Sequence, residues 1–234
     1  MNRISMALLG LFSLVSCTSA GDVTHPYVRQ LTWFSFVNGD DLRASCAAES
    51  PERYRLIYNA RYTKQVRVFE ISALPGGGAT VAERMTGQAN ILEIVPGLEQ
   101  DWAWHGQTAQ TELTPDAFSS LKADFAADGV YAPAPVGLRL YSDAYHWVAV
   151  SCSSGAVSFH AWQFPSEGFK SLRLSKSLLG LKLIDRPIPE PTAPPVLTYK
   201  MEERHPYFHM EVGEGGLVGT SPLLGPPSDF WKNR

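Results

Sequence analysis

Two histidines near the end of the chain have a spacing that could serve metal binding. His205 and His209 are four residues apart, which on a helix places both imidazoles on one face. Pro206 follows the first histidine directly, however, and proline disfavours a helix at that point. A zinc site also needs three or four ligands, and the sequence offers no third one nearby. We therefore predict no metal site.

A serine and a lysine in the middle of the chain have the spacing of a known catalytic pair. Ser119 and Lys122 form an S-x-x-K arrangement, which resembles that of penicillin-binding proteins and class A β-lactamases. The resemblance implies a serine nucleophile, but that chemistry also needs S-D-N and K-T-G motifs. Residues 142–144 read Ser-Asp-Ala, and no K-T-G occurs in the chain. We expect Ser119 to be a surface position.

Two further groups could take part in chemistry but fit structural roles better. Asp143 and His146 could form an acid–base pair, although a histidine beside a β-hairpin is commonly structural. The glycines of residues 75–78 could cradle a phosphate, but the Gly-Lys-Ser/Thr of a phosphate-binding loop is missing. We predict no catalytic residue and no cofactor, and we lean towards a protein that is not an enzyme.

An aromatic loop is the most distinctive candidate for binding. Trp102 and Trp104 share one face of an extended segment, and His105 follows them. Aromatic rings stack on sugar rings or on the side chains of a partner, which makes these residues a candidate aromatic binding surface. The alternative is core packing at the end of a strand, because large aromatic side chains are mostly buried.

The residues that lead to Cys17 resemble the start of a bacterial lipoprotein precursor. Arg3 supplies a basic start, and residues 4–15 form an apolar run that is too short for a membrane span of about 20 residues. Leu14-Val15-Ser16-Cys17 matches the lipobox of that family at all four positions. The resemblance implies that residues 1–16 are a signal peptide, and that Cys17 receives a diacylglycerol thioether and an acylated amino group.

The same resemblance implies a location for the protein. Several acyl chains on Cys17 would anchor residues 17–21 durably as a lipidated tether. Thr18, in place of aspartate, is typical of lipoproteins sent to the outer membrane, on the side that faces the periplasm. The alternative is ordinary cleavage after Ala20, since residues 18–20 also fit a signal-peptidase site. With either processing Cys17 lies outside the folded core, and no second long apolar run predicts a transmembrane helix.

Composition narrows the class of partner. The chain of 234 residues has 20 basic and 23 acidic side chains, a formal net charge of −3. Nucleic-acid binding needs a basic surface, so we exclude that class. A hydrophobic content of 44% and a charged content of 18% are typical of a globular domain with a real core.

Removal of the signal peptide and modification of Cys17 leave two cysteines, Cys46 and Cys152. Outside the inner membrane thiols are oxidised, so the predicted location implies one disulfide between them. Closing a loop of about 100 residues stabilises a fold by about 4.7 kcal/mol on the chain-entropy estimate. The alternatives are two free buried thiols or a catalytic cysteine, and the compartment disfavours both.

Alternating apolar and polar residues predict an antiparallel sheet. We expect strands over 31–37, 53–62, 65–71, 79–85 and 89–95, most of them in a meander with one face open to water. A hairpin over 146–164 is the strongest signal, with a turn at Ser154-Gly155 that sets Trp147 opposite Trp162 and Val150 opposite Phe159.

Two helices are expected beside this sheet. Thr114 and Pro115 have the residue types of an N-cap and a first helical position, and Phe118, Leu121 and Phe125 form an apolar stripe behind them. A second helix is expected from about residue 169 to 183. The fold class that we predict is therefore α+β: an antiparallel β-sheet with at least two packed helices.

The C-terminal part of the chain has a different composition. Residues 185–234 contain nine of the 17 prolines, which favours an extended spacer or docking segment. We therefore divide the chain into a signal peptide, a tether, one α+β domain over 22–184 and a proline-rich extension.

We expect an envelope-anchored lipoprotein that binds or scaffolds another envelope component, either a protein or a glycan. The alternative is a small periplasmic hydrolase that acts on cell-wall or glycan material near Trp102, Trp104 and His105.

Overall fold

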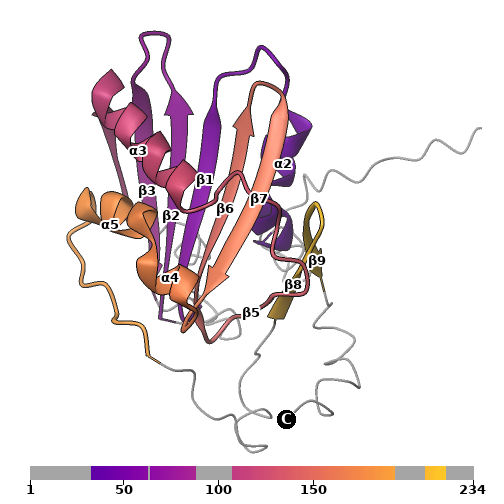
Figure 1. Cartoon of the computed structure of the whole chain (residues 1–234). Coiled ribbons are helices and arrows are strands. Elements are labelled where there is room, and N and C mark those ends of the chain that lie inside the picture. The colour runs from indigo at the N-terminus through magenta and orange to yellow at the C-terminus, as the bar shows by residue number, and fades with distance from the viewer. Residues whose placement is uncertain (1–32, 63, 88–106, 193–208, 220–234) are drawn as a thin grey trace, which may run out of the picture.

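The computed structural model describes residues 33–62, 64–87, 107–192 and 209–219, and the fold is α+β (Figure 1). A six-stranded antiparallel sheet forms its centre, a three-stranded sheet lies behind it, and helices pack on both of its faces. The predicted fold class is confirmed. The strand expected over 89–95 lies outside the described residues.

The large sheet has the strand order β4-β3-β2-β1-β6-β7. The first four strands form a meander, and β6 then returns to pair with β1, so that β1 and β6 lie inside the sheet. The bounds are β1 Arg53–Ala60, β2 Gln65–Ala73, β3 Ala79–Gly87, β4 Gln107–Leu113, β6 Tyr145–Ser153 and β7 Ala156–Gln163.

The β6–β7 hairpin has the predicted register. Trp147 lies opposite Trp162, and Val150 opposite Phe159. Ser154 and Gly155 both have positive φ, as a tight two-residue hairpin turn requires. The side chains of the two tryptophans point to one face and those of Val150 and Phe159 to the other, so this hairpin contributes to two separate cores.

Helix α3, Pro115–Ala127, confirms the predicted first helix. The Thr114 hydroxyl accepts a hydrogen bond from the Ala117 N–H at 3.3 Å, which satisfies one of the free amides of the first turn. Phe118, Leu121 and Phe125 are buried against the sheet.

The single helix expected over 169–183 is wrong, because two short helices replace it. Helix α4, Glu167–Ser171, and helix α5, Arg173–Gly180, are separated by Leu172, whose backbone is extended. Leu172 is buried there, and the Asp128 carboxylate accepts a hydrogen bond from the Leu174 N–H at 2.7 Å. A carboxylate supplied by the end of α3 thus starts the second helix.

The strand expected over 31–37 is also wrong: residues 33–38 are helical, and helix α2, Asp40–Ala44, follows. The apolar run that suggested a strand covers one face of the large sheet, where Val37 is buried and Trp33, Phe34 and Phe36 pack around it. Gly39 makes the turn between the helical segments with φ 70°.

Both faces of the central strands are covered, so the open face expected of the meander is wrong for β1. Helices α3, α4 and α5 cover the face that we name the helical face (Figure 1). The opposite face, named the rear face, is covered by residues 33–38 and by the small sheet. Water reaches the rear face at β3, where Ala82 and Arg84 are exposed while Val81, Glu83 and Met85 on the helical face are buried.

Part of the proline-rich stretch belongs to the fold. The small sheet consists of β5 Arg139–Tyr141, β8 His209–Gly213 and β9 Gly216–Gly219, in the order β5-β8-β9. Met210, Val212 and Leu217 from this hairpin are buried in the rear core. The domain core therefore includes residues that lie after position 185.

Candidate functional site

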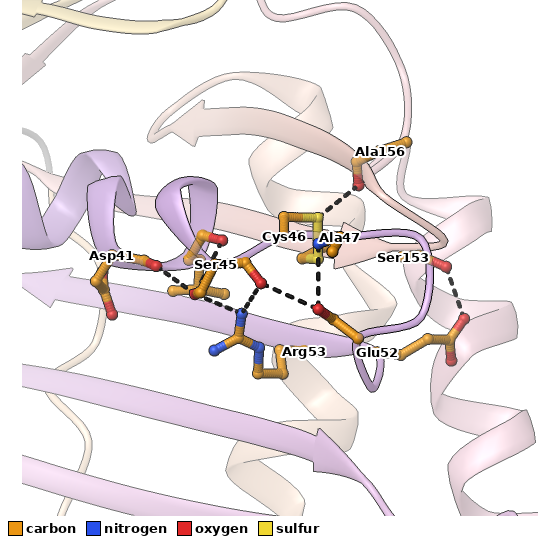
Figure 2. Close-up of a disulfide and its surroundings, with 11 residues drawn as sticks. Asp41, Ser45, Cys46, Ala47, Glu52, Arg53, Ser153 and Ala156 are labelled. Carbon is orange, nitrogen blue, oxygen red and sulfur yellow. Dashed lines mark hydrogen bonds between the residues drawn. A yellow bond between two sulfur atoms is a disulfide. The ribbon is translucent and has the colours of Figure 1, made fainter.

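The structure brings the two remaining cysteines together at one end of the large sheet. Cys46 lies just after α2, and Cys152 lies near the end of β6. Their Sγ atoms are 2.03 Å apart and their Cα atoms 5.7 Å apart, which is a disulfide-forming arrangement (Figure 2). Cys152 is fully buried and Cys46 half-buried, so the pair fastens the segment that covers the rear face to the β6–β7 hairpin.

The loop that carries Cys46 is held by polar side chains of its own and by Arg53 at the start of β1. The Arg53 guanidinium donates to the Ser45 hydroxyl at 2.7 Å and to the Ser45 carbonyl at 3.3 Å (Figure 2). The Ser50 hydroxyl donates to the same carbonyl and accepts from the Ala47 N–H, each at 3.1 Å. These bonds, together with the first residue of β1, position Cys46 against the hairpin.

Glu52 joins three elements beside the disulfide. Its carboxylate accepts hydrogen bonds from the Ser153 hydroxyl at 2.8 Å and from the Lys122 ammonium group at 3.0 Å. Partial burial favours a raised pKa, but the bonds from Lys122 and Ser153 outweigh it and lower the pKa of Glu52 below its ordinary value. Glu52 is therefore ionised at neutral pH, and from its place directly before β1 it binds α3 and the end of β6.

This contact decides the role of the S-x-x-K pair. The Lys122 ammonium group binds Glu52 and lies over the Phe118 ring, 4.9 Å from its centroid, while Ser119 is exposed on α3. The lysine thus contributes to helix docking. The expectation that Ser119 is a surface position is confirmed.

On the rear face, Arg55 is only 4% exposed and connects the helical N-terminal segment to the sheet. Its guanidinium makes two hydrogen bonds of 2.7 Å to the Asp41 carboxylate, and others to Glu70 and to the Phe36 carbonyl. Its charged carbon also lies 3.8 Å from the centroid of the Phe36 ring. Although burial opposes it, the bond to Arg55 lowers the pKa of Asp41, which keeps this pair charged at neutral pH.

On the helical face, Arg67 and Glu83 form a buried ion pair that anchors the start of the proline-rich stretch. Arg67 donates to the Arg186 carbonyl at 2.7 Å, and Glu83 accepts from the Ile184 N–H at 3.2 Å. The Gln65 amide donates to the Pro187 carbonyl at 3.1 Å. All of these contacts to the stretch are made with its backbone.

His146 is buried and unsuited to acid–base work at neutral pH. It is 3% exposed on β6, and burial lowers its pKa to about 3, partly offset by a hydrogen bond with the backbone of Tyr141. The ring is therefore neutral at physiological pH. The low pKa makes the ring a weak base and its burial keeps it from solvent, so both argue against the general-base role that its proximity in sequence to Asp143 could suggest.

Several predicted site residues lie outside the described residues. They are Cys17, the aromatic residues Trp102 and Trp104, and His105 and His205. His209 is described, and its ring lies 5.8 Å from that of Tyr141 in the small sheet. Within the described part of the chain, no group of three or more His, Cys, Asp or Glu side chains is arranged to hold a metal ion.

Sequence reasoning missed the two buried arginines. Arg55 and Arg67 each alternate with apolar residues, a pattern that usually indicates the open face of a strand. The only signal in the sequence was the supply of acidic partners, Asp41, Glu70 and Glu83, on neighbouring segments. These contacts hold the layers of the fold together, so the role of both arginines is structural.

Comparison with protein families and with curated proteins adds no relationship. No known family matches the chain, and a search of curated proteins also found no match. Among the described helices, none has the length and apolar character needed to cross a membrane.

Proposed function

We propose that this protein is a lipoprotein of the bacterial cell envelope, anchored by acyl chains on Cys17. In this proposal the α+β domain lies at the outer membrane, faces the periplasm, and binds or scaffolds another envelope component. The lipobox residues Leu14-Val15-Ser16-Cys17 support the anchor. The net charge of −3 gives no electrostatic attraction to anionic lipid, so attachment would depend on the acyl chains.

The observation that carries the proposal is the pairing of Cys46 with Cys152. Every cysteine of the chain then has a role that belongs outside the cytoplasm: one in the lipobox and two in a disulfide-forming pair. Disulfides persist in the periplasm and are rare in the cytosol. We infer that the pair is oxidised in the mature protein. The disulfide would then fasten to the sheet the N-terminal segment of the domain, which follows the anchor in the sequence.

A binding role is supported by how the charged groups of the domain are used. Arg55, Arg67, Glu52 and Lys122 all bind partners that hold helices or backbone segments on the sheet. The result is a sheet with both central faces packed, and such a rigid body is suited to presenting loops and edges to a partner. The aromatic loop with Trp102, Trp104 and His105 is part of the proposal as a candidate contact with a protein or glycan.

Lipid labelling tests the anchor. The full chain is expressed in a bacterium with an alkyne analogue of palmitate, and its N-terminal peptide is analysed by mass spectrometry. We expect label on Cys17, recovery in the outer-membrane fraction, and loss of both in Cys17→Ala. A soluble protein that begins at Gly21 and carries no acyl group would contradict the proposal.

Binding is tested separately from anchoring. Detergent-solubilised envelopes that contain the full chain are treated with a crosslinker, and the products are identified by mass spectrometry. A stoichiometric envelope partner that is lost in a Trp102→Ala/Trp104→Ala variant supports the binding role. Hydrolysis of a glycan or ester panel that His105→Ala abolishes, with the fold intact, would show instead that the protein is an enzyme.

A further inference from the structure

The outer edge of β4 is open along its length in the described part of the chain. β4 pairs with β3 on one side through residues Gln107–Leu113, and no described backbone group pairs with its other side. The opposite edge strand, β7, has a neighbouring segment beside it, because the backbone of Ala132 and Pro133 lies close enough to the His160 ring to raise its pKa against the lowering effect of burial. The two edges of the large sheet therefore differ.

β4 has few of the residues that commonly prevent edge strands from pairing. Such strands are usually interrupted by proline or a bulge, or carry charged side chains, lysine above all. The sequence Gln-Thr-Ala-Gln-Thr-Glu-Leu of β4 has no proline and no lysine, and Glu112 is its one charged residue. Gln107, Thr108, Gln110 and Glu112 are exposed, so their side chains are free of a covering layer. An open strand of this kind is a template for a further strand.

We propose that β4 pairs with β4 of a second copy of this chain, antiparallel and centred on Gln110. The two large sheets would then join into one continuous sheet across a two-fold axis. This interface goes beyond the lipoprotein function proposed above and does not depend on it. The register places Gln110 opposite itself, and it pairs Gln107 with Leu113, Thr108 with Glu112, and Ala109 with Thr111.

Charge favours this register over its neighbours. Glu112 is the one charged residue in β4, and a register centred on it would place two carboxylates directly opposite each other, which is destabilising. In the register centred on Gln110, Glu112 faces the neutral Thr108. The seven residues of β4 all take part, whereas a shift in either direction leaves some of them unpaired.

Arg84 adds an attraction across the same interface. It lies beside Thr108 in the β3–β4 pair, so it would be two strands away from Glu112 of the second copy. That separation is about 10 Å, within reach of an arginine and a glutamate that extend towards each other over a threonine. Both side chains are exposed, and neither forms an ion pair with another described residue. The two-fold axis would create this pair twice.

A charge-swap experiment tests the interface with the full chain purified in detergent. Any charge placed at position 110 repels its own copy, whereas Lys and Glu at that position attract each other. Gln110 lies beside Ala82 in β3, so neither charge has a charged residue directly opposite it within its own chain. By analytical ultracentrifugation we expect a wild-type dimer, at least about a tenfold weaker dimer for Gln110→Lys and for Gln110→Glu, and a restored dimer in their equimolar mixture.

Cysteine crosslinking gives a second readout that does not require a tight dimer. Opposed residues in an antiparallel pair have Cα atoms about 4.5 to 5.5 Å apart, so Gln110→Cys should form an intermolecular disulfide. Ala82→Cys is the matched control: it is exposed on the adjacent strand, and its two copies would be too far apart to bridge. A monomeric wild type that Gln110→Cys does not crosslink would overturn the proposal. So would a dimer that is indifferent to charge at position 110.

Discussion

The guanidinium of Arg67 and the carboxylate of Glu83 meet inside the protein, on adjacent strands, with each side chain only 2% exposed. Arg67 lies on β2 and Glu83 on β3, and each also binds the backbone of the segment that begins at Ile184. The pair thus connects the meander to a segment about 100 residues further along the chain, and it does so without exposure to solvent.

Removing one partner of this pair should be strongly destabilising. Glu83→Gln leaves the buried Arg67 charge without a carboxylate, and we expect a loss of about 3–5 kcal/mol in the free energy of unfolding. Urea denaturation measures this loss. Glu167→Gln is the matched control, because Glu167 pairs with Lys170 on the surface, and its change should stay within about 1 kcal/mol. Equal effects of the two substitutions would refute a buried role for Glu83.

Loss of the disulfide should lower the stability of the fold without changing which side chains form its core. We expect Cys46→Ser to lower the free energy of unfolding by about 2–5 kcal/mol, because the unfolded chain regains the entropy of an open loop. The variant should be insensitive to dithiothreitol, whereas the wild type should lose a similar amount when reduced. The unreduced, denatured mature protein should titrate with no free thiol, and two free thiols would contradict the pairing.

Burial of His146 predicts a loss of stability in mild acid. The unfolded chain binds a proton at this residue near pH 6.5, whereas the folded protein does not until about pH 3. Between pH 6.5 and about pH 3 the unfolded state therefore binds more protons than the folded state. The free energy of unfolding falls as the pH drops through this range, by up to about 1.4 kcal/mol per pH unit.

Unfolding measured between pH 7 and pH 5 isolates this effect from the carboxylates, because Asp41 and Glu52 have lowered pKa values and stay ionised there. We expect His146→Gln to show a shallower pH dependence than the wild type. Some slope should persist, because burial also lowers the pKa of His160 and His209. An unchanged slope would show that His146 does not contribute.

Gly39 should not tolerate a side chain. It turns the chain between two helical segments with φ 70°, and an added Cβ would lie 2.6 Å from Cγ1 of Val150 in β6. The left-handed backbone alone costs about 1–2 kcal/mol for a residue with a Cβ, so Gly39→Ala should lose at least that much in thermal or urea unfolding. Gly180→Ala, where no atom lies within 4 Å, should be neutral or stabilising by up to about 1 kcal/mol.

Local signals predicted the elements whose stability is local. Helix α3 follows from Thr114 and Pro115, because a cap and a pre-set backbone angle act within one turn. The β6–β7 register follows from the turn at Ser154-Gly155, because two strands joined by two residues have little freedom to shift. In the same way, the alternating pattern predicted β1, β2 and β3.

Residues 33–38 show where local reasoning fails. Their aromatic and β-branched residues favour a strand, yet they are helical, because the rear face of the sheet needs an apolar cover and Arg55 binds the Phe36 carbonyl. The same cause explains the break at Leu172, where the Asp128 carboxylate at the end of α3 caps a new helix. A partner far away in sequence decides the outcome at both places.

The sequence by itself determined the class of the fold, most of its strands and the prediction that Cys46 and Cys152 would pair, since these depend on residue types, alternation and the small number of cysteines. Only the tertiary structure decided that Arg55 and Arg67 are buried, that residues 184–187 and 209–219 belong to the domain, and that β4 has no strand on its outer side among the described residues. Each of these depends on which segments meet in space. A residue's burial is set by the segment that covers it, and its own neighbours in sequence do not encode which segment that will be.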